Sequence, residues 1–124
     1  MKRLIAAGIL LILVITAYVY GYLYIENTCK TAKRYLKECI TVYAEDDDAT
    51  DEAKKLEKYW SNKENGLSFF ANHSKIDEIE LAISSLKIYS NTKDSEIFYE
   101  YSGTVEALIH QLLEDTKPTI HSIF

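Results

Sequence analysis

The sequence predicts an all-α protein in which an N-terminal transmembrane helix continues into an extracytoplasmic antiparallel bundle of about four helices. Residues 4–25 form a run without a charged side chain, and about 20 apolar residues are enough for a helix to cross the hydrocarbon core. The rest has apolar residues at helical spacing, and the 124 residues include only four glycines and one proline. We therefore divide the chain into a membrane anchor, 1–25, and an extracytoplasmic helical domain, 26–124.

The flanks of the apolar run predict the orientation of the anchor. Lys2 and Arg3 precede it, and basic residues in a short N-terminal flank stay on the cytoplasmic side of a membrane. Only residues 1–3 would then lie inside the cell. Tyrosine rings favour the boundary between headgroups and acyl chains, which predicts the outer surface of the membrane at four residues: Tyr18, Tyr20, Tyr22 and Tyr24.

A cleaved signal peptide is the alternative to an anchor. The most apolar part, 4–15, has the length of a signal-peptide core, and cleavage after Gly21 would release a secreted helical domain. The tyrosines, the lack of an A-x-A cleavage motif and the apolar character that lasts to Ile25 favour the anchor. The expected location is therefore the cell membrane, crossed once.

The charge of the domain limits its partners. Residues 26–124 hold all 19 acidic residues and 12 of the 14 basic ones, which gives them a formal net charge of −7. This balance argues against nucleic acid as a partner. Attraction to anionic lipid cannot supply the membrane attachment either, so the contact with the bilayer must come from the apolar helix.

Two cysteines, Cys29 and Cys39, lie on one predicted helix. Ten residues separate them by about 15 Å along the helix axis, which is too far for a disulfide between them. We expect both to be small core residues. A disulfide between two copies of the chain is the alternative.

The first two domain helices follow from two apolar stripes. No glycine or proline interrupts the chain after the anchor, so its helix is expected to continue to about Ala44. The acidic turn 45–51 then caps the second helix, which passes Asn65 and Gly66 because its stripe stays in phase. The stripes are Cys29, Ala32, Leu36, Cys39 or Ile40 and Tyr43, then Ala53, Leu56, Trp60, Leu67 and Phe70.

Two more helices complete the predicted bundle. Ser74 and Asp77 have the spacing of a capping box at the start of the third helix, which ends before the polar turn 91–94. Pro118 stops the fourth helix, and the short tail 119–124 is expected to pack against the bundle. The stripes are Ile76, Ile79, Ile83 and Leu86, then Phe98, Tyr101, Val105, Leu108 and Leu112.

Several short strings along the chain indicate a family. They are the basic start with its apolar anchor, Trp60, the string LSFFANH from Leu67 to His73 that leads into residues 76–79, IDEI, and the closing residues 122–124, SIF. Together they resemble the domain of unknown function family 4363 over the whole chain. The resemblance implies a short single-pass membrane protein of a Gram-positive, often spore-forming bacterium, with a helical domain outside the cytoplasm. It implies no catalytic residue.

The acidic stretch 45–52 suggests calcium but has a simpler explanation. Its carboxylates suit a hard cation, and a loop register would use Asp46, Asp48, Thr50 and Glu57. Asp51, however, stands where such a loop needs glycine for its sharp turn. We expect a solvated turn that caps a helix, and no metal.

The histidines and nucleophiles do not indicate an enzyme. His73, His110 and His121 share no spacing with a metal-ligand motif. Glu106, His110 and Glu114 are four residues apart, which fits an exposed charged face of a helix. The sequence has no G-x-S-x-G string, no glycine-rich phosphate loop and no cysteine beside a histidine, so we expect no catalysis and no cofactor.

The leading functional hypothesis is a non-enzymatic protein-interaction or assembly module that binds another protein or a second copy of itself. Ala17 and Gly21 form a small-xxx-small pair, which favours helix association in membranes. The alternative is a small-ligand-binding domain that works with a membrane partner and has a pocket with convergent polar groups. The interaction candidates are Trp60, His73 and Asp77, although Trp60, like Phe69, Phe70 and Tyr101, is more simply explained as a core residue.

Overall fold

The computed structural model describes residues 1–116, which form four helices. The predicted all-α class and the number of helices are confirmed, and no strand occurs in the described part of the chain. The tail 119–124 lies outside the described residues, and so does its expected packing. The helices are, in chain order, α1 (Lys2–Asp46), α2 (Thr50–Leu67), α3 (His73–Ile88) and α4 (Ser95–Thr116).

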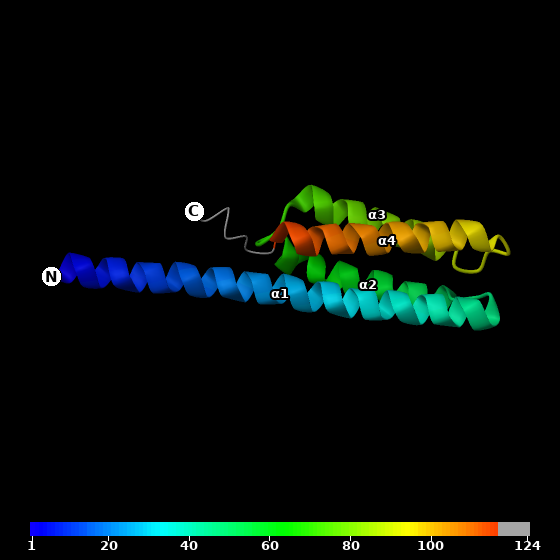
Figure 1. Cartoon of the computed structure of the whole chain (residues 1–124), viewed down its shortest axis with the longest axis horizontal. Coiled ribbons are helices and arrows are strands. Elements are labelled where there is room, and N and C mark those ends of the chain that lie inside the picture. Colours follow the sequence, from blue (N-terminus) through cyan, green and yellow to red (C-terminus); the bar gives the residue numbers. More distant parts are fainter. Residues whose placement is uncertain (117–124) are drawn as a thin grey trace.

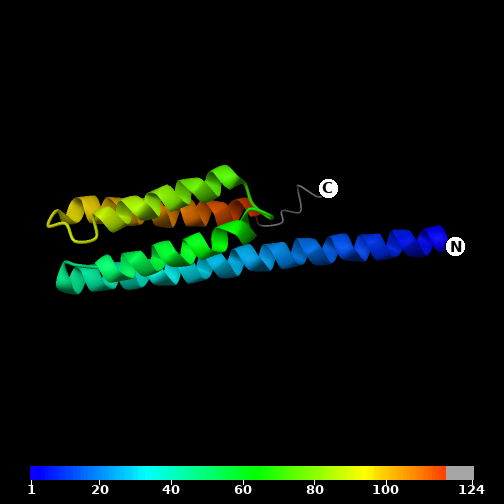
Figure 2. The ribbon, with the colours of Figure 1, turned by 180° about the vertical axis from the view of Figure 1, so that it is seen from behind.

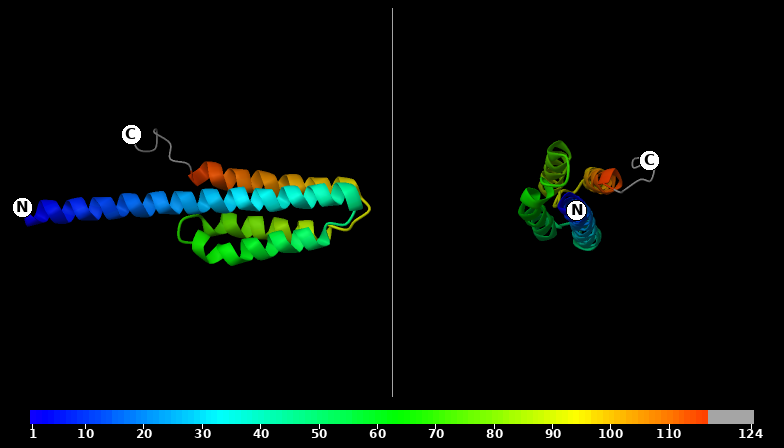
Figure 3. Two further views of the ribbon diagram at one scale, coloured as in Figure 1. Left: turned by 90° about the horizontal axis from the view of Figure 1, so that it is seen from below. Right: turned by 90° about the vertical axis from the view of Figure 1, so that its left-hand side faces the viewer.

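The helices run up and down around one core (Figures 1 and 2). α1 contacts α2 and α4, and α3 contacts the same two helices, so the four form a ring. The view along the long axis in Figure 3 shows the four helices around a common centre. With 45 residues α1 is about 68 Å long, about twice α4, and its first part projects alone beyond the bundle.

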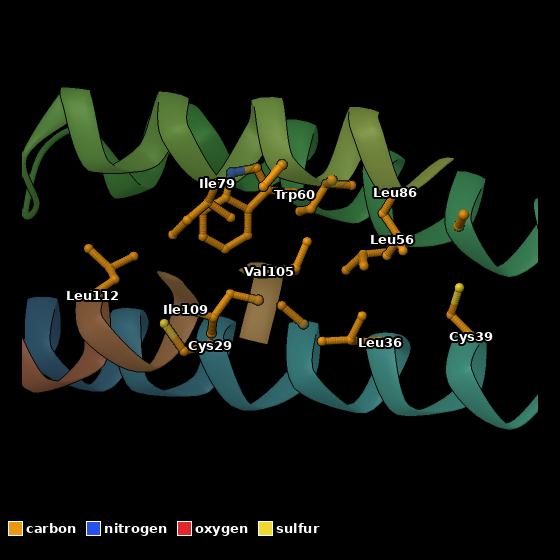
Figure 4. Packing of buried hydrophobic residues seen from close by; sticks show 14 of the residues in the cluster. Cys29, Leu36, Cys39, Leu56, Trp60, Ile79, Leu86, Val105, Ile109 and Leu112 are labelled. Carbon is orange, nitrogen blue, oxygen red and sulfur yellow. The ribbon is translucent and has the colours of Figure 1, made fainter. Parts of the chain in front are cut away.

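The core consists of the predicted stripes, with one shift on α4. Figure 4 shows labelled core residues of all four helices, with Trp60 between the upper and lower pairs. On α4, Ser102 and Ile109 are buried, whereas Tyr101 and Leu108 are only partly buried. Ser102 tolerates burial because its hydroxyl donates to the carbonyl of Phe98, four residues earlier, at 2.9 Å. The α1 stripe is buried as predicted: Cys29, Ala32, Leu36, Cys39 and Tyr43.

The end of α2 differs from the prediction. α2 passes Asn65 and Gly66, as expected, but ends at Leu67, so Phe70 does not belong to it. The expected burial of Phe69 and Phe70 is wrong, since these side chains are 83% and 38% exposed. The chain turns at 68–72 so that α3 can run back along α2, and this turn carries both phenylalanines out of the core.

Local hydrogen bonds also set the start of α3 and the end of α1. The expected capping box of α3 is wrong, because the cap is Asn72, whose Oδ1 accepts from the backbone N–H of Ser74 at 2.9 Å. Asp77 contacts His73 instead. α1 extends two residues past the expected Ala44, to Asp46, and its C-cap, Asp47, has a left-handed backbone with φ 58°.

The turns 47–49 and 89–94 lie side by side at the end of the bundle far from the N-terminus. The backbone N–H of Ala49 donates to the carbonyl of Ser90 at 2.8 Å and joins them. Asp48 accepts hydrogen bonds from the backbone N–H and the hydroxyl of Thr50, the first residue of α2, at 3.1 and 2.6 Å. The N-cap residue of α2 is nevertheless Ala49, which provides no side-chain cap, so the expected cap from an acidic or threonine side chain at that position is wrong; Asp48, one residue earlier, pairs only the first N–H of the helix.

Candidate functional site

Four aromatic rings gather where the projecting part of α1 leaves the bundle, and we call this group the aromatic end. Tyr20 and Tyr24 come from α1, and Phe69 and Phe70 come from the α2–α3 connection. The ring centroid of Phe70 lies 6.0 Å from those of both tyrosines and 6.5 Å from that of Phe69. Figures 1 and 3 show the α2–α3 connection at this end, beside α1.

Two glycines let the aromatic end pack closely. A Cβ atom at Gly21 would overlap the ring of Phe70, and a Cβ atom at Gly66 would overlap the hydroxyl and ring of Tyr24. Gly21 is buried by this contact within the chain, so its proposed role in a small-xxx-small pair with another span competes with Phe70. The pattern of the sequence gives no sign of these contacts, because they join α1 to a turn more than 40 residues away.

The part of α1 before Gly21 is fully outside the bundle. Residues 1–20 are all exposed, including large apolar side chains such as Leu4 at 77% and Leu10 at 63%. The best 18-residue window of α1 has a mean hydropathy of 2.4, and almost none of it is buried. A core helix of a soluble bundle would be buried, so this stretch has the properties of a membrane span or of a signal sequence.

The length of the projecting part matches a bilayer. Residues 2–20 form about 19 helical residues, which span about 28 Å, whereas the hydrocarbon core is about 30 Å thick. Lys2 and Arg3 stand at one end of it and Tyr20 at the other. Of the remaining predicted belt residues, Tyr18 is exposed, whereas Tyr22 and Tyr24 are partly buried.

The interaction candidates differ in accessibility. Trp60 is 1% exposed, and its Nε1–H donates to the carbonyl of Ile76 at 3.3 Å, so a partner cannot reach it in this conformation. His73 and Asp77 are exposed at the start of α3, with Nε2 and Oδ2 3.3 Å apart. His110 is also exposed, with Nε2 3.9 Å from Glu114, as expected for a charged helix face.

Glu64 of α2 and Glu80 of α3 form an acidic pair that the sequence pattern does not predict. Oε1 of Glu64 is buried without a hydrogen-bond donor. Burial first, then the neighbouring carboxyl of Glu80 and the charge of Asp77, raise the pKa of Glu64 to about 7. Sixteen residues separate the two glutamates in the chain, so only the register of α2 against α3 reveals the pair.

Two grooves on the surface of residues 1–116 have room for a small ligand. One of about 230 Å³ lies between α1 and α4. The larger, about 380 Å³, lies between α1 and α2, and long charged side chains form most of its walls, largely through their apolar stems. Within residues 1–116 no three His, Cys, Asp or Glu side chains are placed to hold a metal ion. The larger groove is lined by Arg34, Lys37, Glu38, Thr41, Val42, Glu52 and Lys55.

Comparison with known families agrees with the resemblance seen in the sequence. The model of one family, a domain of unknown function (DUF4363), matches residues 19–123. The chain belongs to this family. The part that matches DUF4363 includes α2, α3 and α4, the bundle portion of α1 and all four rings of the aromatic end, so these rings lie inside the family's domain. No curated protein and no solved structure matches the chain.

Proposed function

We propose that this DUF4363 member is a single-pass membrane protein whose bundle stands outside the cytoplasm and binds another protein or a second copy of itself, without catalysis. One observation carries the proposal. The exposed apolar part of α1, residues 2–20, continues without a break into the buried part of the bundle. In water this stretch would expose apolar side chains along its whole length, whereas a bilayer would cover them.

The aromatic end supports an anchor that is retained. Cleavage after Gly21, the position that the signal-peptide alternative uses, would remove Tyr20 and Gly21 from α1. Both pack against Phe70, so the domain would lose part of its own structure. A cleavable signal sequence has no reason to pack against the domain that it delivers. Lys2 and Arg3 support the cytoplasmic position of the N-terminus.

Support for protein binding comes from α3. Leu81 and Ile88 are 70% and 67% exposed, in contrast to the buried residues between them. Seven residues separate them, so they lie on one face of the helix, about 10 Å apart. This outer face of α3 points away from the core and is where we place the partner. The bacterial setting implied by the family resemblance suits a partner in the membrane or the cell wall.

Membrane anchoring is tested on isolated membranes, and topology is tested in intact cells. The full chain should stay in the membrane pellet after alkaline carbonate extraction, and its mass should include residues 1–21. A cysteine in place of Lys93, in the exposed turn before α4, should react with a membrane-impermeant maleimide. Extraction of the chain by carbonate, or a mass that lacks the first 21 residues, would contradict the anchor.

Protein binding is tested by photo-crosslinking from α3. A photoreactive amino acid at Leu81 should capture a neighbour or a second copy in native membranes, whereas the same group at the exposed Ser61 of α2 should not. Ser61 is a matched control because it is solvent-exposed in a neighbouring helix. Equal capture from both positions, or none from either, would contradict a binding face on α3.

A further inference from the structure

We propose that the aromatic end is a docking surface for the bilayer and that Phe69 inserts among the acyl chains beneath the headgroups. The α2–α3 connection thereby becomes a second membrane contact beside the anchor. The proposal rests on the proposed function, because it needs residues 2–20 to cross the membrane. It adds a lipid-binding role for a loop that lies almost 50 residues later in the chain.

The first argument is the position of Phe69 relative to the outer boundary of the hydrocarbon core. When Lys2 and Arg3 stay at the cytoplasmic surface, about 20 residues from Leu4 onward fill a hydrocarbon core of about 30 Å, so its outer boundary lies near Tyr24, one helical turn after Tyr20. The centroid of the Phe70 ring is 6.0 Å from that of Tyr24, and the centroid of Phe69 is 6.5 Å from that of Phe70. Phe69 is thus within two ring contacts of the boundary, and the α2–α3 connection that carries it lies at the end of the bundle from which α1 projects (Figure 1).

Exposure is the second argument. Phe69 is 83% exposed, whereas Phe98, the phenylalanine of the core, is fully buried. A phenyl ring left in water forgoes the favourable transfer to apolar surroundings, and a bilayer supplies those surroundings. Aromatic side chains are also enriched at the level of the headgroups. A membrane surface therefore explains the position of Phe69, whose ring contact within residues 1–116 is with Phe70 of the same connection.

The backbone N–H groups of the connection are suited to an interface with little water. The N–H groups of Phe69, Phe70 and Ala71 donate to carbonyls at the end of α2, at 3.3, 3.0 and 2.9 Å. The hydroxyl of Ser68 donates to the carbonyl of Glu64 at 2.7 Å, and Asn72 is occupied as the cap of α3. Unpaired backbone groups make entry into a bilayer costly, and these N–H groups are paired.

The bilayer fits this surface better than a protein does because the surface continues directly into the anchor. Any second copy or partner would have to share the same space with the headgroups around Tyr24. The charge of the domain also limits the kind of lipid contact. Residues 26–124 carry a formal net charge of −7, so anionic lipid does not attract them. The contact must therefore be apolar, and it should form on a neutral phosphatidylcholine membrane without any anionic lipid.

The test places a nitroxide label at position 69 of the full chain by F69C and reconstitutes it in vesicles of neutral phosphatidylcholine. K93C, at the opposite end of the bundle, is the matched control. The wild-type chain, treated with the same nitroxide reagent, measures any reaction of the buried native cysteines. Collision rates with oxygen, which concentrates among acyl chains, and with a water-soluble nickel chelate report the depth of each label. We expect a nickel collision rate several-fold lower at 69 than at 93, with a higher oxygen rate at 69.

Each other outcome identifies what has failed. A chain that does not float with the vesicles contradicts the anchor and, with it, the docking. A chain that floats but shows the same high nickel rate at 69 and 93 contradicts the docking alone. A label at 69 that neither oxygen nor nickel reaches is covered by protein, which also overturns the proposal in favour of a second copy.

Discussion

The ring of Tyr43 in α1 stacks on the ring of Phe98 in α4, with centroids 3.7 Å apart and planes at 17°. The hydroxyl of Tyr43 donates to the carbonyl of Thr92 at 2.7 Å, in the turn before α4. Burial raises the pKa of Tyr43, so the hydroxyl keeps the proton that it donates. One side chain thus connects α1 to α4 and to the turn before it, at the end of the bundle farthest from the N-terminus.

Two substitutions separate the stacking from the hydrogen bond. Tyr43→Phe keeps the ring and removes the donor, which should lower the free energy of unfolding by about 1 kcal/mol. Phe98→Ala leaves a cavity in the core and should cost about 3 to 5 kcal/mol. Urea unfolding of the detergent-solubilised chain, followed by circular dichroism, measures both. Equal losses for the two variants would contradict this division.

Gly66 and Gly103 form a matched pair for the aromatic end. No atom lies within 4 Å of a Cβ placed at Gly103, so Gly103→Ala should raise the free energy of unfolding by up to about 1 kcal/mol through helix propensity. Gly66→Ala forces Tyr24 away and should be less stable than Gly103→Ala by at least about 1 kcal/mol. A stabilising effect of the same size at both positions would show that Tyr24 does not pack there.

Glu64 predicts a pH-dependent stability. Its pKa is about 7 in the folded chain, above the ordinary value of 4.5, so the folded state holds a proton that the unfolded state has lost between these values. The free energy of unfolding should therefore fall as the pH rises from about 4.5 to 7, by an amount on the order of 1 kcal/mol because water screens the pair. Thermal unfolding across this range measures the loss.

Two glutamine substitutions test whether Glu64 causes this pH dependence. Glu64→Gln should remove most of the fall, because an amide cannot lose a proton and can donate to Glu80. Glu78→Gln alters an exposed carboxylate of α3 and should leave the fall in place. A pH profile that is the same in wild type and Glu64→Gln would disprove the role of this pair.

The cysteines should be inert while the chain is folded. Both are fully buried and free, and burial raises the pKa of Cys29 to about 11 and that of Cys39 to about 12. Maleimide at pH 8 should label them only after unfolding, whereas a cysteine introduced by K93C reacts at once. A wild-type dimer on a non-reducing gel would favour the intermolecular disulfide instead.

The helical stripes could be predicted because a period of about 3.6 residues is visible in a single sequence. Cys29, Leu36 and Tyr43 fall on one face whatever the partner helix is, and the structure buries all three. The same reasoning failed at Phe70, which stays in phase with the α2 stripe although the helix has already ended. Periodicity does not reveal where a chain must turn so that the next helix can pack.

Contacts between residues far apart in the chain could not be predicted, because the periodicity of a single sequence does not show how its helices pack against one another. Tyr24 packs over Gly66, and Glu64 lies beside Glu80, only because α1, α2 and α3 adopt one particular register. Local polar groups were ambiguous as well, since Asn72 and Ser74 are both good caps and the structure uses Asn72. Composition and spacing therefore predict the helices, while the aromatic end depends on tertiary packing.

With the proposed membrane anchor, the unbroken course of α1 would make the bundle a rigid lever. From Gly21 to Asp46 the helix rises about 39 Å, with no proline or glycine after Gly21 to act as a hinge. A tilt of about 20°, common for single spans, would carry the turn at Asp47 sideways by about 13 Å. Small changes in the angle of the span would thus appear as large displacements at the far turn, where a partner could detect them.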